Sequence, residues 1–184
     1  MFRKLLLSLV AAIAVSIPVH AQDDPDTAPE SDEPDVTTSR FRDWALRCRT
    51  DAESGDTQCT MFQRLVVQET NRVALNVAIG FLQNEQGEPV PVAVFTFPLG
   101  IWLPGGMVLQ VDEGEQVPMA IERCFRRGCQ TGLALNDDLI GQFKAGNQAK
   151  VTIKQSREED IDLTVSLNGF SAGFNALNSS LSGG

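Results

Sequence analysis

Large apolar side chains alternate with small or polar ones along residues 73–81. Val73, Leu75, Val77, Ile79 and Phe81 take every second position, and the residues between them are Ala, Asn, Ala and Gly. Successive side chains of a β-strand point to opposite faces, so this period places all five large side chains on one face. The segment is therefore predicted to be a strand with one buried face.

The same alternation recurs along most of the chain. Further groups are Trp44/Leu46/Cys48, Met61/Leu65/Val67, Met107/Leu109/Val111, Val117/Met119/Ile121, Val151/Ile153 and Ile161/Leu163/Val165. Residues 90–97 are nearly all apolar, which is typical of a strand buried on both faces. Roughly nine strands separated by Gly, Asn, Asp and Pro clusters, with short helices at 137–144 and 169–177, indicate an all-β antiparallel sandwich or barrel.

The first 21 residues have the pattern of a secretory signal peptide. Arg3 and Lys4 form a basic N-terminal region, and residues 5–17 are an apolar run of 13 residues. In the following Val19-His20-Ala21, Val19 and Ala21 occupy the two positions at which a signal peptidase recognises small residues. The run is shorter than the ~20 residues that cross a bilayer as a helix. We expect cleavage after Ala21 and an exported chain without a transmembrane segment, in the periplasm, associated with the outer membrane or secreted. An uncleaved anchor is the alternative.

Removal of this segment excludes several function classes. The only histidine, His20, is lost with it, and the chain has no tyrosine. A histidine base, a Ser-His or Cys-His pair and a histidine metal site are therefore excluded, and no cofactor is predicted. The remaining chain has 13 basic and 24 acidic residues. Because Lys and Arg supply most nucleic-acid affinity, nucleic acid is not an expected partner.

Residues 22–39 contain seven acids and three prolines, with Val36 as the only large aliphatic residue. Such a segment buries too little apolar surface to offset its ordering entropy, so it is predicted to be a disordered linker. A solvated spacer and a binding segment for a basic partner are both compatible with this composition. The folded domain is then predicted to span residues 40–184.

The four cysteines lie in two local pairs. Cys48 and Cys59 enclose ten residues, and Cys124 and Cys129 enclose four. In an oxidising compartment four cysteines allow three disulfide pairings. The local pairing is favoured, because facing residues of a hairpin have a Cα separation of about 5.5 Å, which suits a disulfide. The alternative is a four-cysteine zinc site, although the spacings differ from the usual two-residue knuckles.

Two stretches interrupt the strand pattern and are candidate contact surfaces. Residues 97–106 combine apolar bulk, including Leu99, Ile101 and Trp102, with two prolines that no strand interior accommodates. They either form a contact surface or close one end of the core. Phe125, Arg126 and Arg127 lie between the second cysteine pair and form a positive point suited to carboxylate, phosphate or sulfated-glycan contacts. The alternative is a solvated turn.

Few catalytic routes remain. Paired carboxylates could act as general acid and base, and the acids near turns are Asp112, Glu113, Glu115, Asp137 and Asp138. No nucleophile elbow, Ser-x-x-Lys or phosphate-binding glycine loop is present. Residues 51–56 and 112–115 offer carboxylates near glycines for calcium, but neither has an EF-hand spacing.

The chain resembles the invasion-associated locus B family over about residues 41–178. The elements that carry the resemblance, in chain order, are Trp44, Cys48, Cys59, Pro98-Leu99-Gly100, Leu103-Pro104-Gly105-Gly106, Asp112, Cys124, Gly128-Cys129, Ser166-Leu167, Gly169-Phe170, Ala172 and Leu177. The resemblance implies an exported alphaproteobacterial protein with an immunoglobulin-like β-sandwich, in a family named for a member linked to red-cell invasion.

These observations predict a non-enzymatic envelope protein that binds a protein or another envelope macromolecule, with host-cell interaction or invasion implied by the resemblance. The alternatives are a periplasmic small-ligand carrier and a two-carboxylate hydrolase.

Overall fold

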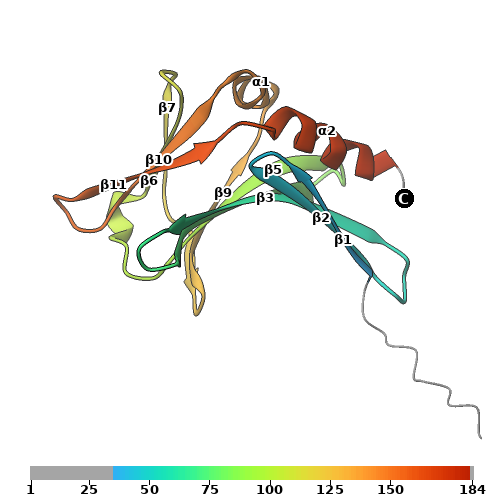
Figure 1. The fold of residues 1–184 in the computed structure, drawn as a ribbon, viewed down its shortest axis with the longest axis horizontal. Coiled ribbons are helices and arrows are strands. Elements are labelled where there is room, and N and C mark those ends of the chain that lie inside the picture. Colours follow the sequence, from blue (N-terminus) through green and yellow to red (C-terminus); the bar gives the residue numbers. More distant parts are fainter. Residues whose placement is uncertain (1–34, 183–184) are drawn as a thin grey trace, which may run out of the picture. The chain divides into compact units, whose positions relative to one another are not determined.

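The computed structural model describes residues 35–182, which fold into two antiparallel sheets and two helices (Figure 1). The predicted signal peptide and residues 22–34 of the predicted linker lie outside the described residues. Sheet A has the strand order β1-β2-β3-β4-β5-β9-β8, and sheet B has the order β11-β10-β6-β7.

The strands of sheet A are β1 (Asp35–Phe41), β2 (Trp44–Thr50), β3 (Thr57–Val67), β4 (Arg72–Gln83), β5 (Pro89–Phe97), β8 (Arg123–Phe125) and β9 (Gly128–Ala134). Those of sheet B are β6 (Met107–Val111), β7 (Gln116–Met119), β10 (Gln148–Lys154) and β11 (Asp160–Ser166). The helices are α1 (Asp137–Ala145) and α2 (Phe170–Ser179), with short 3-10 turns η1 (Leu103–Gly105) and η2 (Ser180–Ser182). No helix within residues 35–182 is long and apolar enough to span a membrane.

One hydrophobic core lies between the sheets. Leu75, Val77 and Ile79 of β4 are at most 1% exposed, as the period of two predicts. They pack in one cluster with inward side chains of sheet B such as Leu109 and Val151. The predicted antiparallel β-sandwich is therefore the observed architecture.

Helix α2 extends this core beyond the edge of sheet B. Figure 1 shows α2 and sheet B on the same side of sheet A, and α2 contacts β1, β2 and β3. Phe170 is fully buried, with its ring edge-on to Trp44 and Phe143 at centroid distances of 5.5 and 5.1 Å. It also stacks on Phe174 at 5.6 Å. The aromatic cluster therefore joins both helices to β2.

The predicted linker boundary is wrong at its end, because residues 35–39 belong to β1. Val36 and Thr38 pair with Arg49 and Arg47 of β2. The strand's side chains are mostly exposed, so its pairing rests on main-chain hydrogen bonds. A composition argument about apolar burial does not detect such an edge strand, although the β-branched run 36–38 is typical of strands.

Two further strand predictions need correction. Residues 90–97 are not buried on both faces: Ala93, Phe95 and Phe97 are buried, whereas the alternate side chains of β5 are only half-buried. In β3, Val67 is 40% exposed despite its place in the predicted alternation. The register to β4 shifts between Leu65 and Val66, and such a bulge changes the face that later residues occupy. Residues 35–182 form eleven strands, more than the roughly nine expected.

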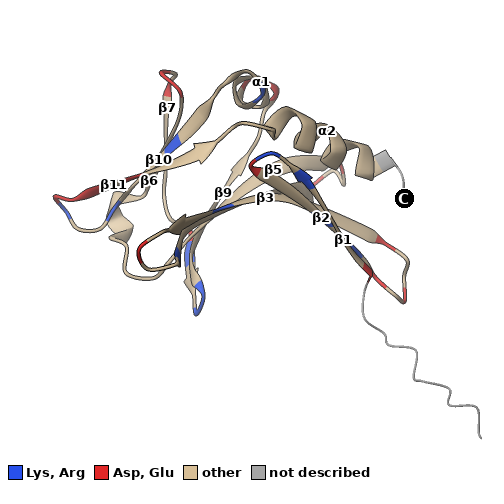
Figure 2. Ribbon diagram, viewed as in Figure 1, with Lys and Arg blue, Asp and Glu red and all other residues tan. Residues whose placement is uncertain are grey.

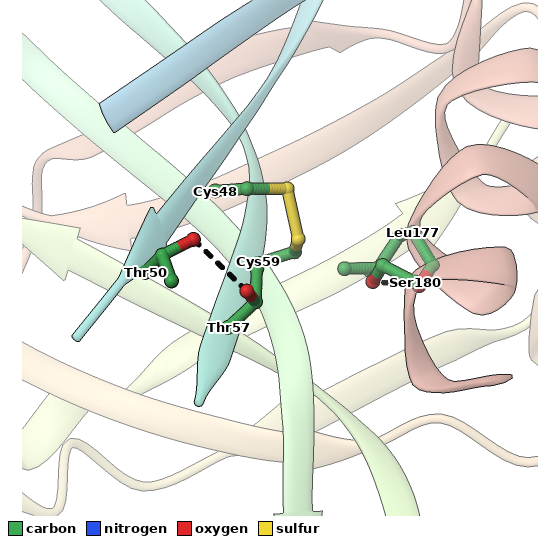
Figure 3. Close-up of a disulfide and its surroundings, with 6 residues drawn as sticks. All are labelled: Cys48, Thr50, Thr57, Cys59, Leu177 and Ser180. Atoms are coloured by element: carbon green, nitrogen blue, oxygen red, sulfur yellow. Dashed lines mark hydrogen bonds between the residues drawn. A yellow bond between two sulfur atoms is a disulfide. The ribbon is translucent and has the colours of Figure 1, made fainter. Parts of the chain in front are cut away.

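Both predicted disulfides are present. Cys48 is joined to Cys59 and Cys124 to Cys129, with Cα separations of 4.0 and 3.9 Å. These separations are shorter than expected and closer to the ~4.5 Å of a non-hydrogen-bonded strand pair. Figure 3 shows the first disulfide beside the Thr50–Thr57 hydroxyl hydrogen bond of 2.9 Å, which continues the same hairpin.

Removal of the Cys48–Cys59 disulfide should cost more stability than removal of Cys124–Cys129. The chain-entropy model gives roughly 3 kcal/mol for the ten-residue loop and roughly 2 kcal/mol for the four-residue loop. Urea unfolding of the two Cys→Ser double variants measures the difference. A greater loss from Cys124→Ser/Cys129→Ser would contradict this prediction.

Candidate functional site

The β8–β9 hairpin exposes the arginine and aromatic side chains that were predicted as a contact surface. Phe125 faces Gly128 in the strand register, and Arg126 and Arg127 form the turn between them. Phe125 is 53% exposed, and the Arg123 guanidinium lies 5.3 Å from its ring centroid. The disulfide closes this turn, so its side chains are presented on a constrained loop.

Gly128 allows this hairpin to approach β5 closely. Its φ is +146°, and a Cβ atom there would lie 2.2 Å from the carbonyl oxygen of Phe97. Any larger residue would push the two strands apart. The hairpin position therefore depends on glycine at this point.

The Pro98–Gly106 loop has both of the roles that were considered from sequence: part of it closes the core, and part of it is an exposed surface. Leu99 and Leu103 are 56% and 47% exposed, whereas Ile101 packs against the core. Trp102 is half-buried, and its main-chain N–H donates to the Lys154 carbonyl at 2.8 Å. Ile101 therefore helps to close the core, and Leu99 and Leu103 remain at the surface.

The structure brings these two candidate surfaces to one end of the sandwich. Phe97 pairs with Cys129, so the loop leaves β5 beside the start of β9. The loop residues from Pro98 to Ile101 also line a cleft of about 350 Å³ between the sheets, together with the β3–β4 turn and residues of β10 and β11. We call residues 66–73, 98–106 and 123–128 the tip end.

Exposed apolar side chains gather at the tip end. Six of the nine large apolar residues that are exposed lie there: Val66, Val67, Val73, Leu99, Leu103 and Phe125. The three valines were not recognised from sequence as surface residues. The position of Val66 and Val67 depends on the β3 bulge, and Val73, which was expected on the buried face, lines the open cleft at the start of β4. The adjacent pair Val66-Val67 breaks the alternation and is the signal that could have revealed it.

The tip end also carries positive charge. Figure 2 shows basic residues at the β8–β9 turn, where Arg126 and Arg127 lie. Within residues 35–182 the structure gives one salt bridge, between Lys154 and Asp160. The arginines of the turn therefore have no ion-pair partner in the described part of the chain, and their donors face solvent.

Two of the carboxylates considered for catalysis or calcium, those of Asp112 and Asp51, accept hydrogen bonds from main-chain N–H groups. The carboxylate of Asp112 accepts hydrogen bonds from the N–H groups of Asn147 and Gln148 at 3.0 and 3.1 Å. It thereby ties the β6–β7 turn to the start of β10. No group of three or more potential metal ligands lies together among the described residues.

Asp51 has a similar role in the β2–β3 turn. The N–H groups of Ser54 and Glu53 donate to its carboxylate at 2.8 and 3.0 Å. These hydrogen bonds, with that from Ser54 the larger cause, hold the pKa of Asp51 below its ordinary value. The acidic turn 51–56 is thus organised by its own main chain.

Comparison with known proteins places the chain in a family. Residues 44–178 match the family model described as "Invasion associated locus B (IalB) protein". Invasion protein B of Bartonella bacilliformis is 28% identical over 146 residues, which cover 77% of this chain and 75% of that protein. The crystal structure of invasion associated protein B from Bartonella henselae has a TM-score of 0.68 and 27% identity, covering 80% of this chain and 99% of that one. The chain therefore belongs to the invasion associated locus B family.

Proposed function

We propose that the chain is an exported, non-enzymatic envelope protein that binds a protein or another envelope macromolecule through the tip end. The main supporting observation is that six of the nine exposed large apolar residues lie at the tip end, which also carries the Arg126–Arg127 turn. Large apolar patches on soluble proteins often mark interaction sites. Aromatic and arginine side chains are also enriched among residues that dominate binding energy.

The constrained geometry of the hairpin favours binding. The Cys124–Cys129 disulfide closes a turn that contains both arginines. A loop that is already ordered loses little entropy on docking. Arginine also pairs with carboxylates through two parallel hydrogen bonds. The proposed partner therefore presents carboxylates near an apolar pocket.

The family supports a role in the envelope or in contact with host cells. The two named relatives are called invasion protein B and invasion associated protein B. A predicted signal peptide supports export of this chain. Host-cell interaction or invasion is the cellular role we propose on these two grounds.

Crosslinking in the native envelope tests the proposal. A photoreactive residue in place of Leu99 or Arg127 should capture the same macromolecule, because both positions belong to the tip end. The matched control is the same residue in place of Lys150, on the outward face of sheet B. Capture that is equal from Lys150, or absent from both tip positions, would contradict the proposal.

The hydrolase alternative has a separate test. Asp112→Ala and Asp137→Ala variants are assayed with a panel of glycosides and esters. We expect that neither substitution removes a hydrolytic activity of the wild-type protein. An activity lost in these variants, with folding intact by circular dichroism, would overturn the non-enzymatic proposal.

A small-ligand carrier is a second candidate function, favoured by the cleft at the tip end. Its volume of about 350 Å³ and its apolar lining, which includes Ile153, Ile161 and Leu163, suit a small apolar ligand. A carrier would show a melting temperature that rises with ligand concentration. Val73→Trp, which fills the cleft, would then abolish that rise.

A further inference from the structure

The strands of sheet A have a charge composition opposite to that of the whole chain. The sequence has 15 basic and 24 acidic residues. In the seven strands of sheet A, however, six arginines accompany a single carboxylate, Asp35. The acidic residues of this part of the chain lie in the turns. The strand residues of sheet A therefore carry a net positive charge, and the Glu122 carboxylate lies beside β9, where it accepts a hydrogen bond from the Gly132 N–H at 3.1 Å.

The strand registers place five of these arginines on the outward face, away from the core. One row across the sheet consists of Arg64, Asn76, Thr96, Gln130 and Arg123. The next row consists of Arg40, Ala45, Phe62, Ala78, Val94 and Gly132. Arg47 and Arg49 point to the same face from β2, because they lie two and four positions after Ala45.

Small and apolar residues lie between the arginines. Ala78, Gly80, Val92, Val94 and Gly132 are half-buried. Four of them, with Thr60, line part of a hollow of about 720 Å³ that continues to the 54–57 turn and to Ser180 and Leu181. The centre of the face is therefore an apolar floor without long side chains.

Two arginine–phenylalanine pairs lie on opposite sides of this floor, one on β2 and β3 and the other on β8. The Arg47 guanidinium lies 5.3 Å from the ring centroid of Phe62, and that of Arg123 lies 5.3 Å from the ring centroid of Phe125. Stacking on a ring holds a guanidinium in place while its N–H groups remain available. The charges at both sides of the floor are therefore held in position.

The outward face of sheet B provides the contrast. There two carboxylates have partners within the sheet: Asp160 forms an ion pair with Lys154, and Asp162 accepts a hydrogen bond from the Thr152 hydroxyl at 2.5 Å. That face has the mixed polar surface expected of a solvated sheet. None of the five outward arginines of sheet A has an ion-pair partner among residues 35–182.

We propose that the outward face of sheet A docks an acidic amphipathic helix of a protein partner. The apolar side of such a helix covers the floor, and its carboxylates reach the arginines on both sides. The main-chain groups of the central strands are paired within the sheet, so an added strand gains no hydrogen bonds on this face. A sulfated glycan would satisfy the arginines but would leave the apolar floor against polar groups.

The width of the outward face of sheet A matches the length of a short helix. The row from Arg40 to Gly132 crosses six strands, a span of about 24 Å at ~4.8 Å per strand. A helix of about 16 residues has that length. This inference deepens the proposed function and rests on it for the claim that the chain binds a macromolecule.

The test uses a labelled 18-residue peptide of Leu, Ala and Glu, with Leu at helical spacing, and a control peptide with Lys in place of Glu. Fluorescence anisotropy at low salt should show binding of the glutamate peptide and at least about tenfold weaker binding of the lysine peptide. Arg47→Glu/Arg64→Glu should weaken binding of the glutamate peptide about tenfold or more. Lys150→Glu on sheet B is the matched control and should leave it unchanged.

Amide and methyl NMR shifts should locate the glutamate peptide at Val92, Val94 and Gly132. If Arg47→Glu/Arg64→Glu does not fold, Arg64→Gln/Arg123→Gln tests the two ends of one row. Equal binding of both peptides, no effect of either variant, or binding of a sulfated oligosaccharide in place of the glutamate peptide would overturn the inference.

The envelope crosslinking experiment separates the two claims. Capture at the tip end without peptide binding to sheet A would leave the proposed function intact and reject this inference. Peptide binding without any capture would support the docking face and reject the proposed envelope role.

Discussion

Phe170→Ala is expected to lower the free energy of unfolding by about 3–5 kcal/mol, the range for truncation of a fully buried phenylalanine. The Phe170 ring is 0% exposed and contacts Trp44, Phe143 and Phe174. Its removal leaves a cavity at the point where both helices meet β2. The surrounding elements cannot collapse into it without separating from the sheet.

Urea unfolding of Phe170→Ala beside Phe125→Ala measures this effect. Phe125 is 53% exposed, so its truncation should change stability by no more than about 0.5 kcal/mol. Similar losses from the two variants would show that α2 does not complete the core.

Gly169→Ala should destabilise the fold by roughly 3 kcal/mol or more. Gly169 has a φ of +89°, and a Cβ atom there would lie 2.0 Å from the carbonyl oxygen of Phe41. The substitution therefore combines an unfavourable backbone conformation with a clash against main-chain atoms. Relief of the clash requires α2 to move away from β1.

Gly141→Ala is the matched control for this substitution. Gly141 lies within α1, and a Cβ atom there would have no neighbour within 4 Å. Alanine should therefore leave stability unchanged or raise it by up to about 1 kcal/mol through helix propensity. Thermal and urea unfolding of both variants give the comparison, and a small effect at Gly169 would refute the argument from close approach.

Most of the fold was predictable because one face of most strands is buried. The period of two in residues 73–81 identified the core side of β4, and the two helices were expected within a few residues of their observed ends. β1 was missed because its stability comes from main-chain pairing at a sheet edge. The bulge after Leu65 was missed because a register shift depends on the partner strand.

The candidate site was predictable only in part. Phe125, Arg126 and Arg127 were selected because a short cysteine pair encloses them, and the structure places them on an exposed turn. Their proximity to Leu99 depends on the pairing of β5 with β9, which the sequence does not specify. The outward arginines of sheet A come from β1, β2, β3 and β8, so their common face required the complete strand order.

The most direct test of the proposed binding role is the affinity of the crosslink-identified partner for the wild-type chain and for Arg126→Glu/Arg127→Glu. Measured at low salt, with far-UV circular dichroism as the folding control, the double reversal should weaken binding about thirtyfold, corresponding to about 2 kcal/mol. Low salt is chosen because charge reversal then acts most strongly. Unchanged affinity in a folded variant would show that the β8–β9 turn is only a solvated turn and would contradict binding through it.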